Sequence, residues 1–511
     1  STSTSRAPPP KPCGSTPAAS ESEGGASTST TASPTTSPAS FATSTMTSAG
    51  TGGSTASEEA TGFPPPMTET GDPTGDPAHT LHFAVIGDYG LDGTPTAQVA
   101  DRVASWNPEM VITTGDNNYF DGLASTIDAN IGKYYRGFIS PYVGTYGAGA
   151  AENRFFPCPG NHDWRSGTLG PYLDYFTLPG NERYYAVRRG PVEFFMLDSD
   201  YHEPDGLTPT QAQGQWLAAA LAESTASFQV VVMHHAPYSS GFHAGTKAMR
   251  WPYAAWGADL VLAGHDHDYE RLVIDGLDYV VTGTGGAALR KFVAEEPGSQ
   301  RGHANGFGAL RAEANEHRLT LDFMAVDGDR VDRLTIAADP PTLWSTRVAT
   351  GATWRWRETP PGEGWDEPDF VDDEWAAGPA PLGFGVGGEA TLLPGGTSEA
   401  RPMTTYFRHR FTASTADLGP WLRLRLALDD GAVVYLNGME VYRINLPEGP
   451  LDGATPASLA VGNWFAERLA QTMISGDALV AGDNVLAVEV HQQAPTSGDL
   501  HLELELAVGV D

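Results

Sequence analysis

Five short segments of the chain each end an apolar run with residues that can bind a metal ion. They are GDYG with Asp88, GDNNY with Asp116, GNHD with Asn161 and His162, VVMHH with His234 and His235, and GHDH with His265 and His267. A single aspartate after a strand is more often a turn or capping residue than a ligand. Carboxylates, an amide and imidazoles at the same point of five segments together predict a metal site. Oxygen and nitrogen donors without a thiolate suit iron, zinc or manganese.

Two of these segments carry a second polar residue whose spacing bears on the chemistry. GDNNY places Tyr119 three residues after Asp116, where it is either a turn aromatic or a phenolate ligand of the same metal. GHDH places imidazoles on alternate residues, so a turn can aim them at different ions. One carboxylate can bridge two ions about 3.5–4 Å apart, and such pairs recur in enzymes of phosphoryl transfer.

The elements that must position these residues are read from the apolar pattern. LHFAVIG, MVITTGD, FQVVVMHH and ADLVLAGH predict buried strands, and TAQVADRVASW and QAQGQWLAAALA have helical spacing. Strands that alternate with helices predict an α/β layered domain over residues 79–338. Its functional loops are expected after the carboxyl ends of the strands, where ligands bind in open α/β sheets.

The C-terminal part has a different pattern. Apolar and polar residues alternate in WLRLRLALDDGAVVYLNGMEV, with Asn437-Gly438 as a hairpin turn, and again in NVLAVEVHQ and DLHLELELAVG. This predicts an all-β jelly-roll domain over residues 345–511. The module is similar to galactose-binding-like jelly rolls, which implies a carbohydrate or surface ligand. Asp429 and Asp430 could ligate calcium, but a turn that enters the hairpin is the simpler interpretation.

The first 78 residues and the overall charge indicate the setting of the protein. Residues 1–78 are mostly Ser, Thr, Pro, Gly and Ala and predict a disordered linker, which is typical of secreted or cell-surface (extracellular or periplasmic) proteins. A formal charge of −33 argues against a nucleic-acid partner, and we find no apolar run that could form a transmembrane segment. Cys13 is a lipid-anchor residue or an incidental cysteine of this segment.

The five blocks in order read Asp-x-Gly, Gly-Asp-x-x-Tyr, Gly-Asn-His-Asp, Val-x-x-His and Gly-His-x-His. This order resembles the purple acid phosphatases of the binuclear metallophosphoesterase (calcineurin-like) superfamily, over residues 80–338. Most metallophosphoesterases have Asp-x-His in the first block, and Gly90 stands where that His would be. The resemblance implies that a ferric ion is held by Asp88, Asp116, Tyr119 and His267. It implies that a second, divalent ion (zinc, iron or manganese) is held by Asp116, Asn161, His234 and His265.

The VVMHH block leaves two choices of ligand. Anchoring on His-x-Pro selects His235. Anchoring on the strand selects His234 and places His243 nine residues further, at the interval of a substrate-contacting histidine in the purple phosphatases. We favour His234 as the ligand and expect His235 to support the loop.

These residues predict a secreted phosphatase that hydrolyses phosphomonoesters, with small-molecule phosphate esters as substrates. A metal-bound hydroxide would attack phosphorus, while His162 and His243 assist the leaving group and the phosphate. Asp163 is expected to orient His162, and Arg271 to join a structural salt bridge. The alternatives are a phosphodiesterase or nucleotide-cleaving enzyme with the same metals and, more remotely, a surface binding protein without catalysis.

Overall fold

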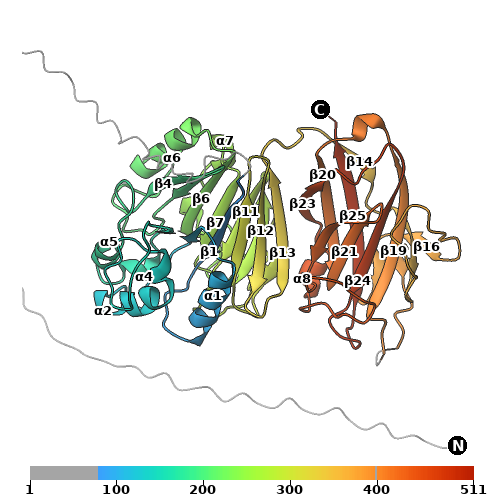
Figure 1. Ribbon diagram of the computed structural model, residues 1–511, viewed down its shortest axis with the longest axis horizontal. Coiled ribbons are helices and arrows are strands. Elements are labelled where there is room, and N and C mark those ends of the chain that lie inside the picture. The colour runs from blue at the N-terminus through green and yellow to red at the C-terminus, as the bar shows by residue number, and fades with distance from the viewer. Residues whose placement is uncertain (1–78, 398–399, 511) are drawn as a thin grey trace, which may run out of the picture. The chain divides into compact units, whose positions relative to one another are not determined.

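The computed structural model of the protein describes residues 79–397 and 400–510 (Figure 1). The predicted linker 1–78, with Cys13, lies outside the described residues. Within them, the strands form four β-sheets, two before residue 338 and two after it. No helix in this part of the chain is long and apolar enough to cross a lipid bilayer.

The first two sheets each contain a group of parallel strands. The order in the first sheet is β13 (Arg330–Ala337), β12 (Arg318–Ala325), β11 (Gly308–Ala314), β1 (Leu81–Ile86), β2 (Met110–Thr113) and β3 (Phe155–Pro157). The order in the second is β10 (Ser299–His303), β8 (Tyr269–Ile274), β9 (Leu277–Thr282), β7 (Leu260–Gly264), β6 (Phe228–His235), β5 (Val192–Met196) and β4 (Tyr185–Arg189). Strands β1, β2 and β3 are parallel, and so are β5, β6, β7 and β9.

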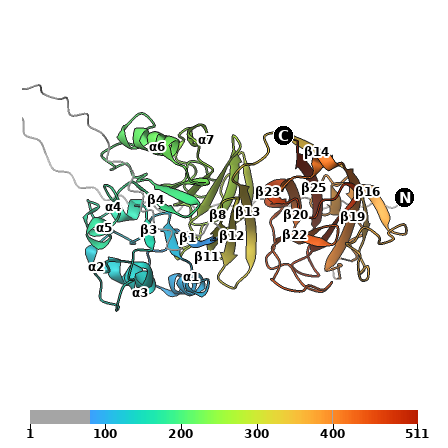
Figure 2. The same cartoon turned by 45° about the horizontal axis from the view of Figure 1, so that its top comes forward.

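Alternation along the strands packs these two sheets against each other. Val230 and Val232 of β6 share one core with Phe83 of β1, so the two sheets meet face to face. Val231 and the other alternate residues of β6 face a second core, which α6 (Ala212–Glu223) completes. Figures 1 and 2 both show α6 lying against the second sheet, and the expected layered α/β fold is confirmed.

The helices connect these strands. Helix α1 (Thr94–Ser105) buries Thr96, Val99, Ala100 and Val103 at helical spacing, and it ends before Asn107 and Pro108, which cannot continue it. The remaining helical segments are α2 (Ala124–Ile127), a π-helical turn Asp128–Gly132, α3 (Lys133–Tyr135), 3₁₀ turns Arg136–Phe138, Lys247–Met249 and Thr415–Asp417, α4 (Asn161–Trp164), α5 (Gly170–Tyr175), α7 (Tyr253–Trp256) and α8 (Asn463–Ala466).

The C-terminal part consists of two six-stranded sheets. One contains β14 (Trp344–Val348), β17 (Leu382–Phe384), β18 (Thr391–Leu392), β20 (Trp421–Asp429), β23 (Ala470–Ser475) and β25 (Leu500–Gly509). The other contains β15 (Thr353–Arg357), β16 (Ala376–Pro379), β19 (Thr404–Ala413), β21 (Gly431–Leu436), β22 (Met439–Ile444) and β24 (Gly482–His491). Their inner faces share one apolar core, as a β-sandwich requires.

The hairpin predicted in this part is present. Asn437 and Gly438 both have positive φ, 53° and 83°, and join β21 to β22 as a two-residue turn. Trp354 is fully buried in the core. The all-β character of the C-terminal part is confirmed, while the predicted domain limits 79–338 and 345–511 stay a prediction.

Arg271 joins the two sheets of the α/β part through a buried ion pair. Its guanidinium donates to both carboxylate oxygens of Asp332, at 2.7 and 3.1 Å, and Tyr269 donates its hydroxyl to the same carboxylate at 2.8 Å. Both charged side chains are fully buried. Burial by itself would raise the pKa of Asp332, but Arg271 holds it below its ordinary value. Arg271 therefore has the structural role expected from the sequence.

We predict that Asp332→Ala strongly destabilises the protein, because it leaves the buried guanidinium of Arg271 unpaired. The free energy of unfolding should fall by about 3–5 kcal/mol, measured by urea titration. Glu313→Ala is the control, since it removes an exposed pair with Arg318 at 3.3 Å and should change stability by less than about 1 kcal/mol. Equal losses in the two variants would contradict a structural role for the buried pair.

Candidate metal centre

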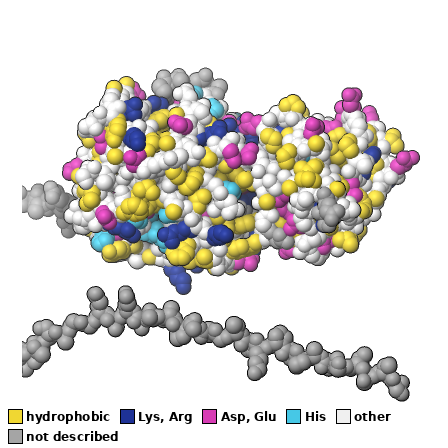
Figure 3. Space-filling model, turned by 90° about the horizontal axis from the view of Figure 1, so that it is seen from below, with side chains coloured by type: hydrophobic (Ala, Val, Ile, Leu, Met, Phe, Trp, Pro, Cys, Tyr) yellow, Lys and Arg dark blue, Asp and Glu magenta, His cyan; other side chains and the backbone are white. Residues whose placement is uncertain are grey.

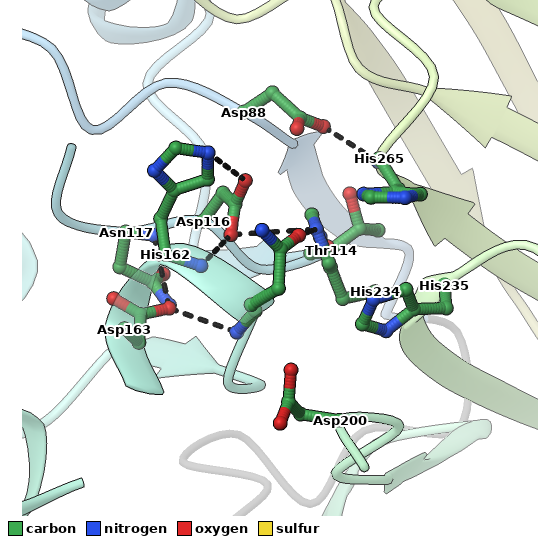
Figure 4. Close-up of polar contacts among 12 residues, drawn as sticks. Asp88, Thr114, Asp116, Asn117, His162, Asp163, Asp200, His234, His235 and His265 are labelled. Atoms are coloured by element: carbon green, nitrogen blue, oxygen red, sulfur yellow. Dashed lines mark hydrogen bonds and ion pairs between the residues drawn. The ribbon is translucent and has the colours of Figure 1, made fainter. Parts of the chain in front are cut away.

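The five segments singled out in the sequence meet where parallel strands of both sheets end. Asp88 follows β1, Asp116 follows β2, and Asn161 begins α4 after β3. From the second sheet, His234 lies near the end of β6 and His265 follows β7. Figure 4 shows Asp88, Asp116, His162, His234 and His265 around one space. The expectation that the functional loops follow strand ends is met for four of the segments, whereas His234 and His235 are the last two residues of β6 itself.

Three of these residues share an unusual backbone conformation. Asp88, Asp116 and His265 have positive φ angles of 53°, 54° and 73°. Each follows a glycine, and such angles are uncommon for residues with a side chain. At Gly115 an added Cβ would lie 2.7 Å from the side chain of His234, so this close approach excludes any other residue. Outliers of this kind cluster at functional sites.

Asp88, Tyr119 and His267 form one group of contacts. The Tyr119 hydroxyl donates to Asp88 Oδ1 at 2.9 Å and lies 3.3 Å from His267 Nε2. His267 Nε2 also lies 3.3 Å from Asp88 Oδ1. All three side chains are buried. The side chain of Tyr119 thus points back at the loop of Asp88 and is not a turn aromatic.

Asp116, Asn161 and His234 form the second group. His234 Nε2 lies 3.0 Å from Asn161 Oδ1 and 3.3 Å from Asp116 Oδ1. Asp116 Oδ1 also accepts the main-chain N–H of His162 at 2.8 Å. The ligand atoms of Asp88, Asp116 and His234 all lie within 4.8 Å of one another. Asp116 therefore stands between the two groups, where the sequence resemblance places a bridging ligand.

His235, His243 and His265 complete the surroundings. His234, His235 and His265 also offer ligand atoms within 4.8 Å of one another. The Nδ1 atom of His235 lies 2.9 Å from the Ser199 hydroxyl, while the His243 ring stacks on His265 with centroids 4.1 Å apart. The structure brings both residues of VVMHH to the centre, and the choice of His234 as ligand stays a prediction.

Four of the imidazoles are oriented in the same way. Because a carbonyl oxygen only accepts, each Nδ1 must carry the proton that it donates to a main-chain carbonyl. The acceptors are Phe120 for His162 at 2.6 Å, Thr114 for His234 at 2.9 Å, His265 for His243 at 2.9 Å, and Ala288 for His267 at 2.7 Å. Each Nε2 is then left free for a ligand or substrate, an arrangement typical of metal-binding histidines.

These contacts provide a test of whether a metal ion fits. With Nδ1 protonated, the lone pair of His234 Nε2 faces two oxygens, and that of His267 Nε2 does the same. Such contacts are attractive only when a proton or a metal cation lies between the atoms. Two ligands about 2.1 Å from one ion and at right angles to each other lie about 3 Å apart, which matches the observed 2.9–3.3 Å. The residues fit a metal centre.

The pKa values of the buried side chains also indicate a site that attracts a cation. Burial disfavours a charged His234, but Asp116 and Asp88 raise its pKa to about 10. Burial would likewise raise the pKa of Asp116, yet His234 holds it well below its usual range. Burial together with the charge of His234 lowers the pKa of His235 to about 3 and that of His265 further. The site therefore draws a cation to Asp116 and keeps the neighbouring imidazoles neutral.

The expected role of Asp163 is wrong. Its carboxylate accepts the main-chain N–H of Gly160 at 2.8 Å and both N–H groups of Asn117, at 3.2 Å for the main chain and 2.8 Å for the side chain. It does not bond to the His162 ring, which the Phe120 carbonyl orients instead. Asp163 thus joins the Asp116 loop to the Asn161 loop, because the N–H groups it meets belong to those two loops.

The sequence analysis did not identify the buried residues that hold the Asp116 loop by hydrogen bonds on the side away from the metal site. Asn117 accepts hydrogen bonds from the Tyr89 and Thr113 hydroxyls, at 2.8 and 2.7 Å. Asn130 donates to the Asn118 side chain at 2.8 Å and to the Tyr119 carbonyl at 2.9 Å. Two consecutive asparagines after a strand were the only available sign, and they also suit an ordinary turn.

Gly90 explains why this chain has no histidine in its first block. A Cβ at Gly90 would lie 2.1 Å from the carbonyl carbon and oxygen of Asn117. The main chains are tied together on both sides, since Gly90 N–H donates to Asp116 at 3.2 Å and Tyr119 N–H donates to Gly90 at 2.7 Å. No side chain fits between the two loops, and Tyr119 reaches the position beside Asp88.

The mouth of the centre combines aromatic and cationic side chains. The glycine-rich turn after β9 packs on the centre, with Ala287 N–H donating to the main-chain carbonyl of Asp88 and Arg290 N–H to that of His267. The Arg290 guanidinium covers the Phe242 ring at 4.5 Å, and Phe242 is 56% exposed. On the face shown in Figure 3, histidines gather beside basic and hydrophobic side chains. The Arg290 guanidinium brings a positive charge beside the centre, and a cationic side chain in such a position attracts anions.

Comparisons with known proteins identify the family that part of the chain matches. Residues 81–269 match the calcineurin-like phosphoesterase family. The chain is 27% identical over 285 residues to purple acid phosphatase 3 of Arabidopsis thaliana, covering 49% of this chain and 75% of that protein. It is 28% identical over 250 residues to tartrate-resistant acid phosphatase type 5 of Rattus norvegicus, covering 41% and 73%. A solved purple acid phosphatase from yellow lupin (Lupinus luteus) seeds superposes with a TM-score of 0.43 at 18% identity, covering 51% and 54%.

Residues 81–269 are therefore a calcineurin-like phosphoesterase domain with purple acid phosphatase relatives, as the motif order predicted. The prediction of an enzyme that hydrolyses phosphoesters is confirmed at this level. The family relation implies a dinuclear metal centre, and the two ligand groups around His234 form a site that suits one.

We predict that Gly90→Ala impairs the centre, because its methyl group must displace the Asn117 backbone and with it Asp116 and Tyr119. Displacement of catalytic groups by about 1 Å can cost about 10²-fold in rate, so kcat/KM for a phosphate ester and bound metal should both fall steeply. Gly137→Ala is the control, since nothing lies within 4 Å of an added Cβ there. Full activity and metal content in Gly90→Ala would contradict the packing argument.

Proposed function

We propose that the protein is a phosphatase that hydrolyses phosphomonoesters at a dinuclear centre of one ferric and one divalent ion. The observation that carries the proposal is the convergence of Tyr119, Asp88 and His267 at 2.9–3.3 Å next to the Asp116–His234–Asn161 group. An oxygen-rich group with a phenol suits a hard ion such as Fe(III), and a group with more imidazole suits zinc, iron or manganese.

The proposed ligands follow from these two groups. Asp88, Tyr119 and His267 would hold the ferric ion, Asp116 would bridge, and Asn161, His234 and His265 would hold the divalent ion. Burial, Asp116 and Asp88 all raise the pKa of Tyr119 far above its ordinary value. The phenol therefore ionises only when a strong Lewis acid takes the place of its proton, which favours a trivalent ion in this position.

The protein's own side chains would bind and protonate the substrate. Bound metal ions supply Lewis acidity toward phosphoryl oxygens and lower the pKa of water. His162 and His243 have Nδ1 fixed by main-chain carbonyls, so that Nε2 faces inward and, when the ring is an imidazolium, would donate its second proton to the leaving oxygen or to a phosphoryl oxygen. Burial lowers the pKa of His162, and the carboxylate of Asp116, 3.8 Å from its Nε2, opposes that effect.

The substrate class is proposed as small phosphate monoesters. The basic and aromatic mouth at Arg290 and Phe242 supports an anionic substrate. A secreted location and a carbohydrate or surface ligand of the C-terminal sheets stay predictions, drawn from the Ser/Thr/Pro-rich segment and from the jelly-roll resemblance.

We predict a broad visible absorption band in the iron-loaded protein, from charge transfer between the Tyr119 phenolate and ferric iron. Tyr119→Phe should abolish the band. Tyr185→Phe is the matched control, because this buried tyrosine bonds to the Pro157 carbonyl, away from the centre, and should keep it. A visible absorption spectrum and an analysis of the iron content together test whether Tyr119 is a ligand of ferric iron. A colourless, iron-free protein with full activity would refute the ferric assignment.

We predict that the protein hydrolyses p-nitrophenyl phosphate much faster than the bis(p-nitrophenyl) ester, and that His162→Ala lowers kcat for the monoester by about 10²–10⁴-fold. Bound metal should stay unchanged, because a proton donor is lost and not a ligand. His317→Ala, an exposed histidine of the same domain, should keep full activity. Faster turnover of the diester would favour the phosphodiesterase alternative, and unchanged kcat in His162→Ala would contradict its role.

A further inference from the structure

Two exposed phenylalanines lie beside the two histidines proposed as proton donors. Phe120 is 62% exposed and Phe242 is 56% exposed, and no other phenylalanine within residues 79–397 and 400–510 is mostly exposed. The centroid of the Phe120 ring lies 6.5 Å from that of His162, and the centroid of the Phe242 ring lies 5.2 Å from that of His243. Single exposed apolar side chains are ordinary, but two that stand in the same relation to the reacting groups indicate a common role.

Phe120 is held by the loop that orients His162. Its main-chain carbonyl accepts the Nδ1–H group of His162 at 2.6 Å. The carbonyl of the preceding residue, Tyr119, accepts the side-chain amide of Asn130 at 2.9 Å, and the Tyr119 ring lies 4.2 Å from the His162 ring. The exposed ring therefore projects from a segment that hydrogen bonds tie to the metal centre.

Phe242 is held by contacts with the GHDH loop. The Arg290 guanidinium lies over its ring at 4.5 Å, a cation–π contact, and the main-chain N–H of Arg290 donates to the carbonyl of His267 at 3.0 Å. The main-chain N–H of His243, the next residue, donates to Asp266 Oδ1 at 2.6 Å. The residues on both sides of the ring are thus bonded to the loop that supplies His265 and His267.

The two phenylalanine rings are the ends of one series of ring contacts around the centre. The centroids of successive rings lie 6.5, 4.2, 6.2, 6.2 and 5.2 Å apart in the order Phe120, His162, Tyr119, His267, His243 and Phe242. The inner rings are those of proposed ligands and proton donors, so the phosphoryl group of a substrate belongs beside them. Figure 3 shows hydrophobic side chains next to histidines on this face.

The position of the proton donors locates the leaving group. A proton donor must lie within hydrogen-bond reach of the oxygen that it protonates. The organic group bonded to that oxygen then lies on the outer side of His162 or His243, where the exposed rings of Phe120 and Phe242 stand. An apolar surface at this point favours an organic group that removes it from water.

We propose that Phe120 and Phe242 bind the leaving group and select phosphate monoesters whose leaving group carries an aromatic ring. This inference rests on the proposed phosphatase function and names a substrate class for the same site. An aromatic ring gains from burial against phenylalanine and from edge-to-face or offset contacts with it, whereas a small alkyl group covers little of either ring. The reaction is the same hydrolysis: phosphorus gains a bond to the oxygen of water, its bond to the leaving oxygen breaks, and that oxygen takes a proton.

The test compares benzyl phosphate with ethyl phosphate, because both esters release an alkyl alcohol and differ mainly in the ring. The metal-loaded full chain should favour benzyl phosphate in kcat/KM by at least about tenfold. Phe120→Ala, which keeps the carbonyl that orients His162, and Phe242→Ala should each lower this preference by about 3–10-fold. The loss should appear mainly as a higher KM for benzyl phosphate, since a binding contact is removed.

Two further variants serve as controls. Phe242→Tyr retains an aromatic ring and should retain the preference for benzyl phosphate. Val371→Ala shortens a side chain of the C-terminal part that is 75% exposed, and it should leave both kcat/KM values unchanged. Metal content is measured for every variant, and if Phe120→Ala loses metal, the Phe242 variants decide the outcome.

The outcomes separate this inference from the proposed function. An unchanged preference in both alanine variants, with both esters still hydrolysed, overturns the role of the two rings and leaves the phosphatase function standing. Hydrolysis of neither ester by the unaltered chain overturns the function and this inference together. Equal kcat/KM for cyclohexylmethyl phosphate and benzyl phosphate would overturn the aromatic class, because an apolar group of similar size would then bind equally well.

Discussion

The hydrogen bonds from imidazole Nδ1 to main-chain carbonyls are the interaction on which the metal centre depends. They fix His162, His234, His243 and His267 with Nε2 facing inward. Each acceptor carbonyl belongs to a loop or strand end that carries, or adjoins, another residue of the centre. The backbone around Asp116, at His265 and at Ala288 therefore also orients the rings, and displacement of any of these segments would turn an imidazole away from the site.

The two sheets supply the complementary parts of this arrangement. Strands β1, β2 and β3 end in Asp88, Asp116 and Asn161, whereas β6 and β7 end in His234 and His265. One sheet thus brings oxygen donors and the other brings nitrogen donors, and the apolar core between the sheets sets their separation. Behind the loops, Asn117, Asp163 and Tyr89 connect the centre to that core by buried hydrogen bonds. The geometry of the centre therefore depends on the same packing that stabilises the fold.

Buried carboxyl groups occur in both parts of the protein, and their hydrogen-bond partners differ. In the catalytic domain the carboxylates of Asp88 and Asp116 meet N–H groups, a hydroxyl and imidazoles, so they are largely satisfied even by the protein alone. In the C-terminal sheets Asp429 is equally buried and meets only other oxygens. The same residue type after a strand is a member of a polar network in one place, and in the other it is a buried carboxyl group whose pKa burial and its carboxyl neighbours raise to about 10.

The sequence by itself determined which residues gather at the centre, because side chains that follow neighbouring parallel strands must emerge at one edge of a sheet. It also determined the Asn437-Gly438 hairpin, since a two-residue turn is specified by its own residues. Only the tertiary structure decided which groups each of these side chains contacts. The lack of space for a side chain at Gly90, the Phe120 carbonyl that replaces Asp163 beside His162, and the raised pKa of the buried Asp429 beside Asp499 all arise between segments distant in the chain. Local spacing carries no information about such contacts, because they depend on how separate loops pack against one another.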